Sequence, residues 1–278
     1  MSNFKIIADS SADLLSLDFV DFSSAPLKII TADKEFVDDE NLSLNEMVDY
    51  LLTYKGKSST SCPNPEDWLT AFGDSENIFC IAITSNLSGS YNAALTAKDL
   101  YLEEHPDRKV FVIDSLSAGP ELRLIAEKLE ELILQNLSFE EICQEISEYQ
   151  KSTALLFMLE SMQNLANNGR VSALSAKAAG LLGIRAVGKA SDVGTLEPLA
   201  KCRGEEKALT YIAEYLKNAG CKNGRVYITH CFNQTAALKL KEKLLNIMPN
   251  IETKIYSCGG LCSFYAEKGG LLVGFEKN

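Results

Sequence analysis

The sequence predicts an α/β protein of two domains, the first built on a parallel, doubly wound sheet with helices on both faces. Short apolar runs rich in β-forming residues alternate with amphipathic helical patterns through the first half of the chain, at residues 5–11, 79–86 and 110–115. Each run is apolar on both faces, which is typical of strands buried in a parallel sheet. The length of 278 residues is sufficient for two domains, because one hydrophobic core usually serves roughly 100–200 residues.

Helical patterns separate and follow these strands. Pro65 suits the first turn of a helix, where its missing N–H costs nothing, and Asn64 before it is a typical N-cap residue. The spacing of apolar residues predicts helices over residues 42–54, 65–73, 90–104 and 121–135.

The second half alternates less regularly and predicts a smaller, mixed α+β domain. Residues 184–190 and 195–202, joined by the polar turn 191–194, are expected to form a hairpin. We place the boundary near residue 155, which gives domains 1–155 and 156–278. The other expected elements are helices at 138–152, 161–166, 173–183, 205–220 and 235–247 and strands at 154–160, 225–231, 251–258 and 271–275.

Charge and hydropathy exclude several kinds of partner. The 27 Lys and Arg against 38 Asp and Glu give a net charge of −11, whose average field repels nucleic acid, and no basic patch offsets it. No apolar run approaches the roughly 20 residues needed to span a bilayer, so no integral membrane segment is expected. The first residues show no targeting signal, and a cytoplasmic location is the expectation.

The motifs of the common cofactor and catalytic sites are missing from the sequence. The eight cysteines are scattered without a C-x-x-C pair, so neither a zinc site nor a disulfide framework is expected. There is no P-loop, no G-x-G-x-x-G after the first strand and no G-x-S-x-G nucleophile elbow. We therefore expect no cofactor and no metal, and binding rather than catalysis.

Two segments rich in hydroxyl side chains are the candidate site. Thr60 and Ser61 lie in a loop that opens a helix, and Ser85, Ser88 and Gly89 lie between a strand end and the next helix. Free N–H groups at a helix start receive an anion well, and parallel strands bring their carboxyl ends to one edge of a sheet. These residues are therefore expected to form an anion pocket, although hydroxyls in such positions also serve as ordinary helix caps.

Three charged residues are further candidates. Arg170, in the turn Asn168-Gly169-Arg170, is suited to close over an anion through a charge-assisted hydrogen bond, or to be an ordinary surface arginine. Asp9 and Asp114, both at strand ends, form the alternative hypothesis of a metal-dependent hydrolase or phosphotransferase. Capping and loop hydrogen bonds explain these two carboxylates equally well.

Several motifs follow one another along the chain: IIADSSADL, TSCPNPEDWLTAF, ITSNLSGSYNAA, VFVIDSLSAG, LANNGRVS and KCRGEEKAL. Their order and spacing resemble those of the DegV family, bacterial fatty-acid-binding proteins that serve as the lipid-carrying subunit of fatty acid kinase. The resemblance covers essentially the whole chain. It implies a non-enzymatic protein that holds a long-chain fatty acid in an internal tunnel and presents its carboxylate to the kinase catalytic subunit for phosphorylation.

The resemblance also implies roles for particular residues. The T-S-x-P segment with Thr60 and Ser61 and the S-x-L-S-G segment with Ser85, Ser88 and Gly89 would hold the carboxylate. Arg170, in the G-R-x-S turn, would lie near the head group. Family members often carry a histidine in a glycine-rich loop near the C-terminus, where this sequence has Tyr265. A tyrosine hydroxyl can hydrogen-bond a carboxylate but brings no positive charge. Another amphipathic anion, such as an isoprenoid acid, remains an alternative ligand.

Overall fold

A four-stranded parallel sheet, sheet A, forms the centre of the first domain. The computed structural model describes residues 4–172 and 183–277, and the strand order in sheet A is β2-β1-β6-β7 with every neighbouring pair parallel. The strands are β1 (Phe4–Asp9), β2 (Asp21–Ala25), β6 (Asn77–Ala82) and β7 (Lys109–Asp114).

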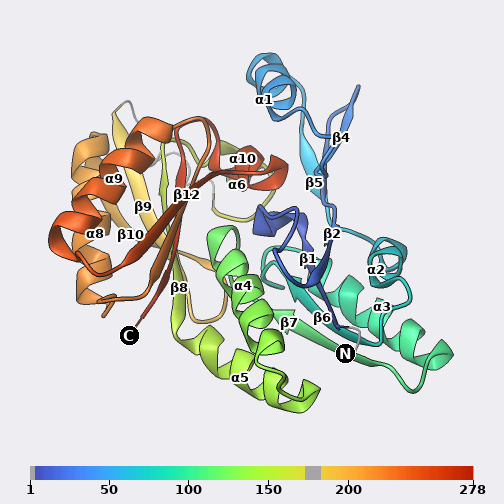
Figure 1. The fold of residues 1–278 in the computed structure, drawn as a ribbon. Helices are drawn as coiled ribbons and strands as arrows, with labels where there is room; N and C mark the ends of the chain where they lie inside the picture. The colour runs from blue at the N-terminus through green and yellow to red at the C-terminus, as the bar shows by residue number, and fades with distance from the viewer. Residues whose placement is uncertain (1–3, 173–182, 278) are drawn as a thin grey trace.

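Helices cover both faces of sheet A, because successive side chains on each buried strand point to opposite faces. Ile7 and Cys80 pack with helices α2 (Pro65–Phe72) and α3 (Ser90–Glu104). Their neighbours along the strands pack with helices α4 (Pro120–Leu134) and α5 (Phe139–Lys151) on the other face. Figure 1 shows the two pairs of helices on either side of the sheet. The predicted doubly wound sheet is confirmed.

Helix α2 begins as its sequence predicts. The Asn64 side chain accepts a hydrogen bond from the Asp67 N–H at 3.0 Å, and the Asp67 carboxylate accepts one from the Asn64 N–H at 2.8 Å. This reciprocal capping box satisfies two N–H groups that a helix leaves unpaired. Pro65 occupies the first helical position, and Trp68 and Phe72 are fully buried against sheet A.

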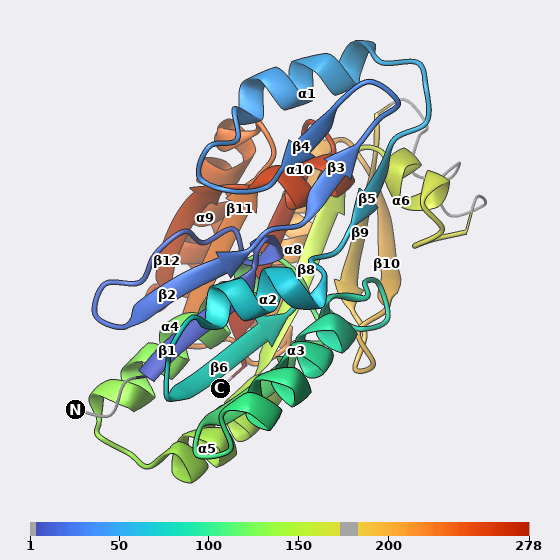
Figure 2. The ribbon, with the colours of Figure 1, turned by 90° about the vertical axis from the view of Figure 1, so that its right-hand side faces the viewer.

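A small antiparallel sheet, sheet B, was not predicted from the sequence. Its order is β4-β3-β5, and helix α1 (Leu44–Thr53) packs beside it. Thr60 and Ser61 lie in its strand β5 and not in a loop as expected. Figure 2 shows sheet B and α1 next to helix α10 (Gly260–Ala266), and the buried Phe264 of α10 packs against them. The strands are β3 (Lys28–Ile30), β4 (Glu35–Val37) and β5 (Ser59–Ser61).

A six-stranded mixed sheet, sheet C, carries the second half of the chain. Its order is β10-β9-β8-β13-β11-β12, in which only the β11–β12 pair of the described strands is parallel. The hairpin predicted from residues 184–202 is confirmed as β9 and β10. The strands are β8 (Thr153–Leu159), β9 (Ile184–Ala190), β10 (Leu196–Arg203), β11 (Arg225–His230), β12 (Glu252–Ser257) and β13 (Leu271–Glu276).

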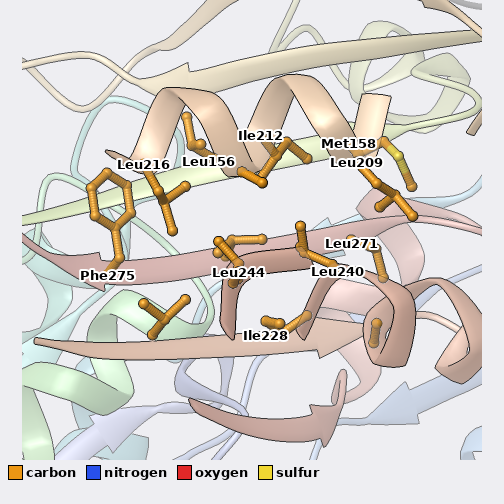
Figure 3. Close-up of a cluster of buried hydrophobic side chains, with 14 of the residues drawn as sticks. Leu156, Met158, Leu209, Ile212, Leu216, Ile228, Leu240, Leu244, Leu271 and Phe275 are labelled. Carbon is orange, nitrogen blue, oxygen red and sulfur yellow. The ribbon is translucent and has the colours of Figure 1, made fainter. Parts of the chain in front are cut away.

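Helices α8 (Glu205–Asn218) and α9 (Gln234–Ile247) cover one face of sheet C. Figure 3 shows Ile212 of α8 and Leu240 of α9 packed on Leu156 and Ile228 of the strands, a cluster with almost no solvent exposure. Helix α4 contacts the opposite face, so it lies between sheets A and C. The helix α6 (Gln163–Asn167) and the short 3-10 helix Ser10–Ala12 complete the described helices.

The expected domain boundary at residue 155 falls inside strand β8, whose seven residues all belong to sheet C. The helical segment expected at 173–183 falls almost entirely on residues 173–182, outside the described part of the chain. Within the described residues, every helix is too short or too polar to cross a membrane.

The tip of the β9–β10 hairpin reaches back to the first domain. The Asn86 side-chain amide donates to the Val193 carbonyl at 2.6 Å. Gly194 has φ of 75°, and a Cβ atom there would collide with the side chain of Thr84 and the backbone of Leu116. Only glycine therefore fits this contact without displacing its neighbours.

Candidate ligand-binding cavity

A largely apolar cavity of about 280 Å³ lies between elements of both domains. Strand β8 contributes Leu155, Phe157 and Leu159, and α10 contributes several more of the lining side chains. The other apolar residues that line it are Leu27, Cys62, Ile83, Leu87, Ala118, Leu165, Leu196, Leu261, Cys262, Ala266 and Leu272. An apolar chain can be buried here, and the polar residues of the lining decide where its head group belongs.

The polar lining residues contact one another. The hydroxyl groups of Thr60 and Tyr265 are 2.7 Å apart, which joins strand β5 of the first domain to α10. The guanidinium of Arg170 lies 5.7 Å from the centre of the Tyr265 ring. It is held there because Nε donates to the Leu87 carbonyl at 3.1 Å and Nη1 donates to the Asn168 carbonyl at 2.6 Å.

Ser61, Ser88 and Gly89 complete the polar lining. Ser88 accepts a hydrogen bond from the Ser90 N–H at 3.3 Å, so its hydroxyl serves the start of α3 and the cavity wall together. A Cβ atom on Gly89 would come within 3.2 Å of the Cys62 sulfur. The absence of a side chain at Gly89 lets the two segments approach closely.

Ser85 is the one predicted site residue that does not line this cavity. Its backbone N–H donates to the Asp114 carboxylate at 3.1 Å, which holds it at the carboxyl ends of β6 and β7. The other predicted residues Thr60, Ser61, Ser88, Gly89, Arg170 and Tyr265 all contribute to the lining.

Burial raises the pKa of the Tyr265 hydroxyl, although the contact with Thr60 and the charge of Arg170 act in the opposite direction. The hydroxyl therefore stays protonated at neutral pH and can donate to an anion. An anion at this end of the cavity would meet donors on three separate elements. Such hydrogen bonds to a charged acceptor are among the strong ones in proteins.

Two aspartate side chains of the first domain hold the start of α10, the helix that carries Tyr265. Asp38 accepts hydrogen bonds from the Gly260 N–H at 2.6 Å and the Leu261 N–H at 2.9 Å. Asp13 accepts one from the Gly259 N–H at 2.7 Å. Nothing in the local sequence distinguished these acids from surface residues. Their role depends on pairing with residues more than 200 positions away.

The carboxylates of the alternative hypothesis are engaged in loop hydrogen bonds. Asp9 is fully buried and accepts from the Ile83 N–H at 2.8 Å and the Ser90 hydroxyl at 2.6 Å. Asp114 accepts from the N–H groups of Ser85 and Leu116. In the described part of the chain, no group of three or more His, Cys, Asp or Glu side chains is arranged to hold a metal ion. Both aspartates thus fix the strand-end loops.

Fold and cavity define a two-domain α/β protein whose two halves together line an apolar cavity with a polar patch in its wall. The model of the DegV family COG1307, described as an uncharacterised protein family, matches residues 3–278. The chain belongs to the DegV family. It is 47% identical over 277 residues to a DegV domain-containing protein of Streptococcus pneumoniae, an alignment that covers 98% of this chain and 99% of the relative.

Solved structures of similar proteins contain fatty acids. A DegV family protein from Eubacterium eligens, loaded with heptadecanoic acid, has a TM-score of 0.97 and 43% identity and covers 99% of this chain and 100% of that one. The Fatty Acid Kinase (Fak) B3 protein of Streptococcus pneumoniae, loaded with linoleic acid, has a TM-score of 0.97 and 46% identity with full coverage of both chains.

Proposed function

We propose that this protein binds a long-chain fatty acid, with the acyl chain in the apolar cavity and the carboxylate against Thr60, Ser61, Ser88, Arg170 and Tyr265. The observation that carries the proposal is the cavity itself, which is apolar over most of its wall and has hydroxyl and guanidinium donors gathered on one part of it. The fatty acids in the similar proteins of Eubacterium eligens and Streptococcus pneumoniae support the same ligand class.

The acyl chain and the carboxylate of the ligand contribute differently to the free energy of binding. Burying a chain of about fifteen methylenes at roughly 0.8 kcal/mol each contributes on the order of 12 kcal/mol. Each hydrogen bond to the carboxylate adds about 1.5–3 kcal/mol. The chain therefore supplies most of the affinity, and the polar patch orients the ligand and selects an acid over an ester or alcohol.

The fatty acid would be handed to a separate kinase and not converted by this chain alone. The carboxylate oxygen would attack the γ-phosphorus of ATP on the kinase catalytic subunit, with ADP as the leaving group and an acyl phosphate as the product. The protein is then a non-catalytic, lipid-carrying subunit. The relation to the Fak B3 protein supports this role.

Native mass spectrometry and lipid extraction of the purified protein test the binding. We expect one bound acid of about fourteen to eighteen carbons, which exchanges with added hexadecanoate after delipidation. Failure to co-purify or take up any such acid would refute the proposal; recovery of an isoprenoid acid instead would change the ligand class. For the partner, the loaded protein is mixed with a fatty acid kinase catalytic subunit and ATP, and acyl phosphate is trapped as a hydroxamate with hydroxylamine.

A further inference from the structure

Strand β8 leads from the apolar cavity directly to a second, polar cavity. Side chains on a strand alternate between its faces. Leu156 and Met158 face the core beneath α8 and α9 (Figure 3), whereas Leu155, Phe157 and Leu159 line the cavity. The next residue on the cavity side is Thr153, and it lines another cavity of about 480 Å³. Leu155 lines both cavities.

The second cavity, called the rear chamber below, opens to solvent beside the exposed Lys151 and has a different chemistry. Its wall includes the almost fully buried polar residues Ser115, Glu121 and Thr153, with 1%, 5% and 4% of their surface exposed. The Thr153 hydroxyl donates to the Glu121 carboxyl group at 2.7 Å. Burial raises the pKa of Glu121. Buried hydroxyl and carboxyl groups of this kind offer hydrogen bonds to a polar ligand atom.

The charges around the rear chamber favour a neutral group over a second anion. Lys151 and Lys277 line it together with Asp114, Glu121 and Asp192. These side chains bring no excess of positive charge that would compensate a carboxylate. A hydroxyl group, which both donates and accepts, matches the mixed lining.

The stretch of β8 between Leu159 and Leu155 sets how far an extended chain runs along this wall before it meets Leu155. A strand advances about 3.3 Å per residue, so Leu159 and Leu155 lie roughly 13 Å apart along β8. An extended acyl chain, with C–C bonds of about 1.5 Å, advances about 1.3 Å per methylene, so roughly ten methylenes fill this stretch. Chains that continue in the same direction meet the Leu155 side chain and, behind it, Thr153.

We propose that Leu155 is the end wall that sets acyl length, and that the rear chamber is a subsite for the distal hydroxyl of ω-hydroxylated long-chain acids. This inference rests on the proposed fatty acid binding. Rotation of the Leu155 side chain joins the two cavities, and the hydroxyl then meets Thr153 and Glu121. An acyl chain with an apolar end gains nothing from that step and stays in front of Leu155.

Paired titrations of the delipidated protein with hexadecanoate and 16-hydroxyhexadecanoate test the inference. A closed apolar end would bury the hydroxyl without a partner and weaken binding by a factor of about ten to a hundred or more. We expect the two acids to bind within about threefold of each other, because the rear chamber supplies the missing hydrogen bonds. A hydroxy acid that binds more than about thirtyfold worse than its parent overturns the inference.

Two variants locate the effect. Thr153→Val is expected to weaken the binding of 16-hydroxyhexadecanoate by about tenfold and to leave the binding of hexadecanoate unchanged. Leu155→Ala is expected to increase the affinity for the hydroxy acid and for longer acids relative to hexadecanoate. Thermal unfolding of each variant checks that it folds. If Thr153→Val affects both acids equally, the rear chamber is not a subsite. If the unmodified protein binds neither acid, the proposed function itself fails, and the inference fails with it.

Discussion

Removal of the Tyr265 hydroxyl tests how the head group is held. In Tyr265→Phe the ring remains beside Arg170 and Phe264, and only the oxygen 2.7 Å from Thr60 is lost. That oxygen can accept from Thr60 and still donate to a ligand carboxylate. A hydrogen bond to a charged group is worth about 1.5–3 kcal/mol, so hexadecanoate should bind roughly ten to a hundred times more weakly.

The assay is a titration of delipidated protein with hexadecanoate and with methyl hexadecanoate as the uncharged control. The affinity for methyl hexadecanoate should fall by less than about threefold in Tyr265→Phe, because a neutral ester forms a weaker hydrogen bond with this donor than a carboxylate does. Thr60→Val and the double variant complete a double-mutant cycle, and their effects should not add because the two hydroxyls share one hydrogen bond. An equal loss for acid and ester, or no loss for either, would refute the placement of the carboxylate at Tyr265.

Three further predictions concern the residues that hold the site and the two domains together. Burial raises the pKa of Asp13 from 3.8 to about 8, so the folded protein keeps a proton there that the unfolded chain releases. The free energy of unfolding therefore falls as the pH rises between these two pKa values. Asp13→Asn should reduce that fall in urea unfolding between pH 5 and pH 9, and an unchanged pH dependence would contradict it. Asp38→Asn removes a hydrogen-bond acceptor from the start of α10. It should lower the free energy of unfolding by about 1–3 kcal/mol and weaken hexadecanoate binding. An unaltered affinity for hexadecanoate would show that the position of α10 does not affect the site. Arg225 donates to Glu276 at 2.9 Å and 2.8 Å with both side chains largely buried, so Arg225→Met should cost about 3–5 kcal/mol in the same unfolding assay. Lys151→Met, which removes an exposed ion pair, is the control and should change stability by less than about 1 kcal/mol.

Three of the four strands of the parallel sheet could be predicted, because β1, β6 and β7 are apolar runs. Strand β2 was not predicted, because its sequence DFSSA is too polar to resemble a buried strand. Sheet B could not be predicted either, because three-residue strands are too short to show a period of two. Its strand β5 exists through pairing of Ser59–Ser61 with Lys28–Ile30, about thirty residues earlier in the chain. Local sequence around Thr60 therefore indicated a loop where long-range pairing forms a strand.

The polar part of the cavity could be predicted better than its apolar part. Hydroxyl side chains at strand and helix ends are recognisable in sequence, and Ser88 and Thr60 do reach the cavity, although Ser85 beside them does not. On β8, however, Leu155 lines the cavity and Leu156 lies in the core of sheet C. The two residues are chemically identical, so only the sheet that surrounds them separates a ligand contact from a core contact.

The position of β13 in sheet C has a consequence for synthesis of the protein on the ribosome. β13 is the last described strand of the chain, yet it lies inside the sheet, between β8 and β11. Sheet A can be completed once residues up to Asp114 have emerged, whereas β8 and β11 must wait with unpaired edges until Glu276 is available. Exposed edges invite aggregation. The wall of the apolar cavity, which includes Leu272 of β13, is likewise complete only when this last described strand has been made.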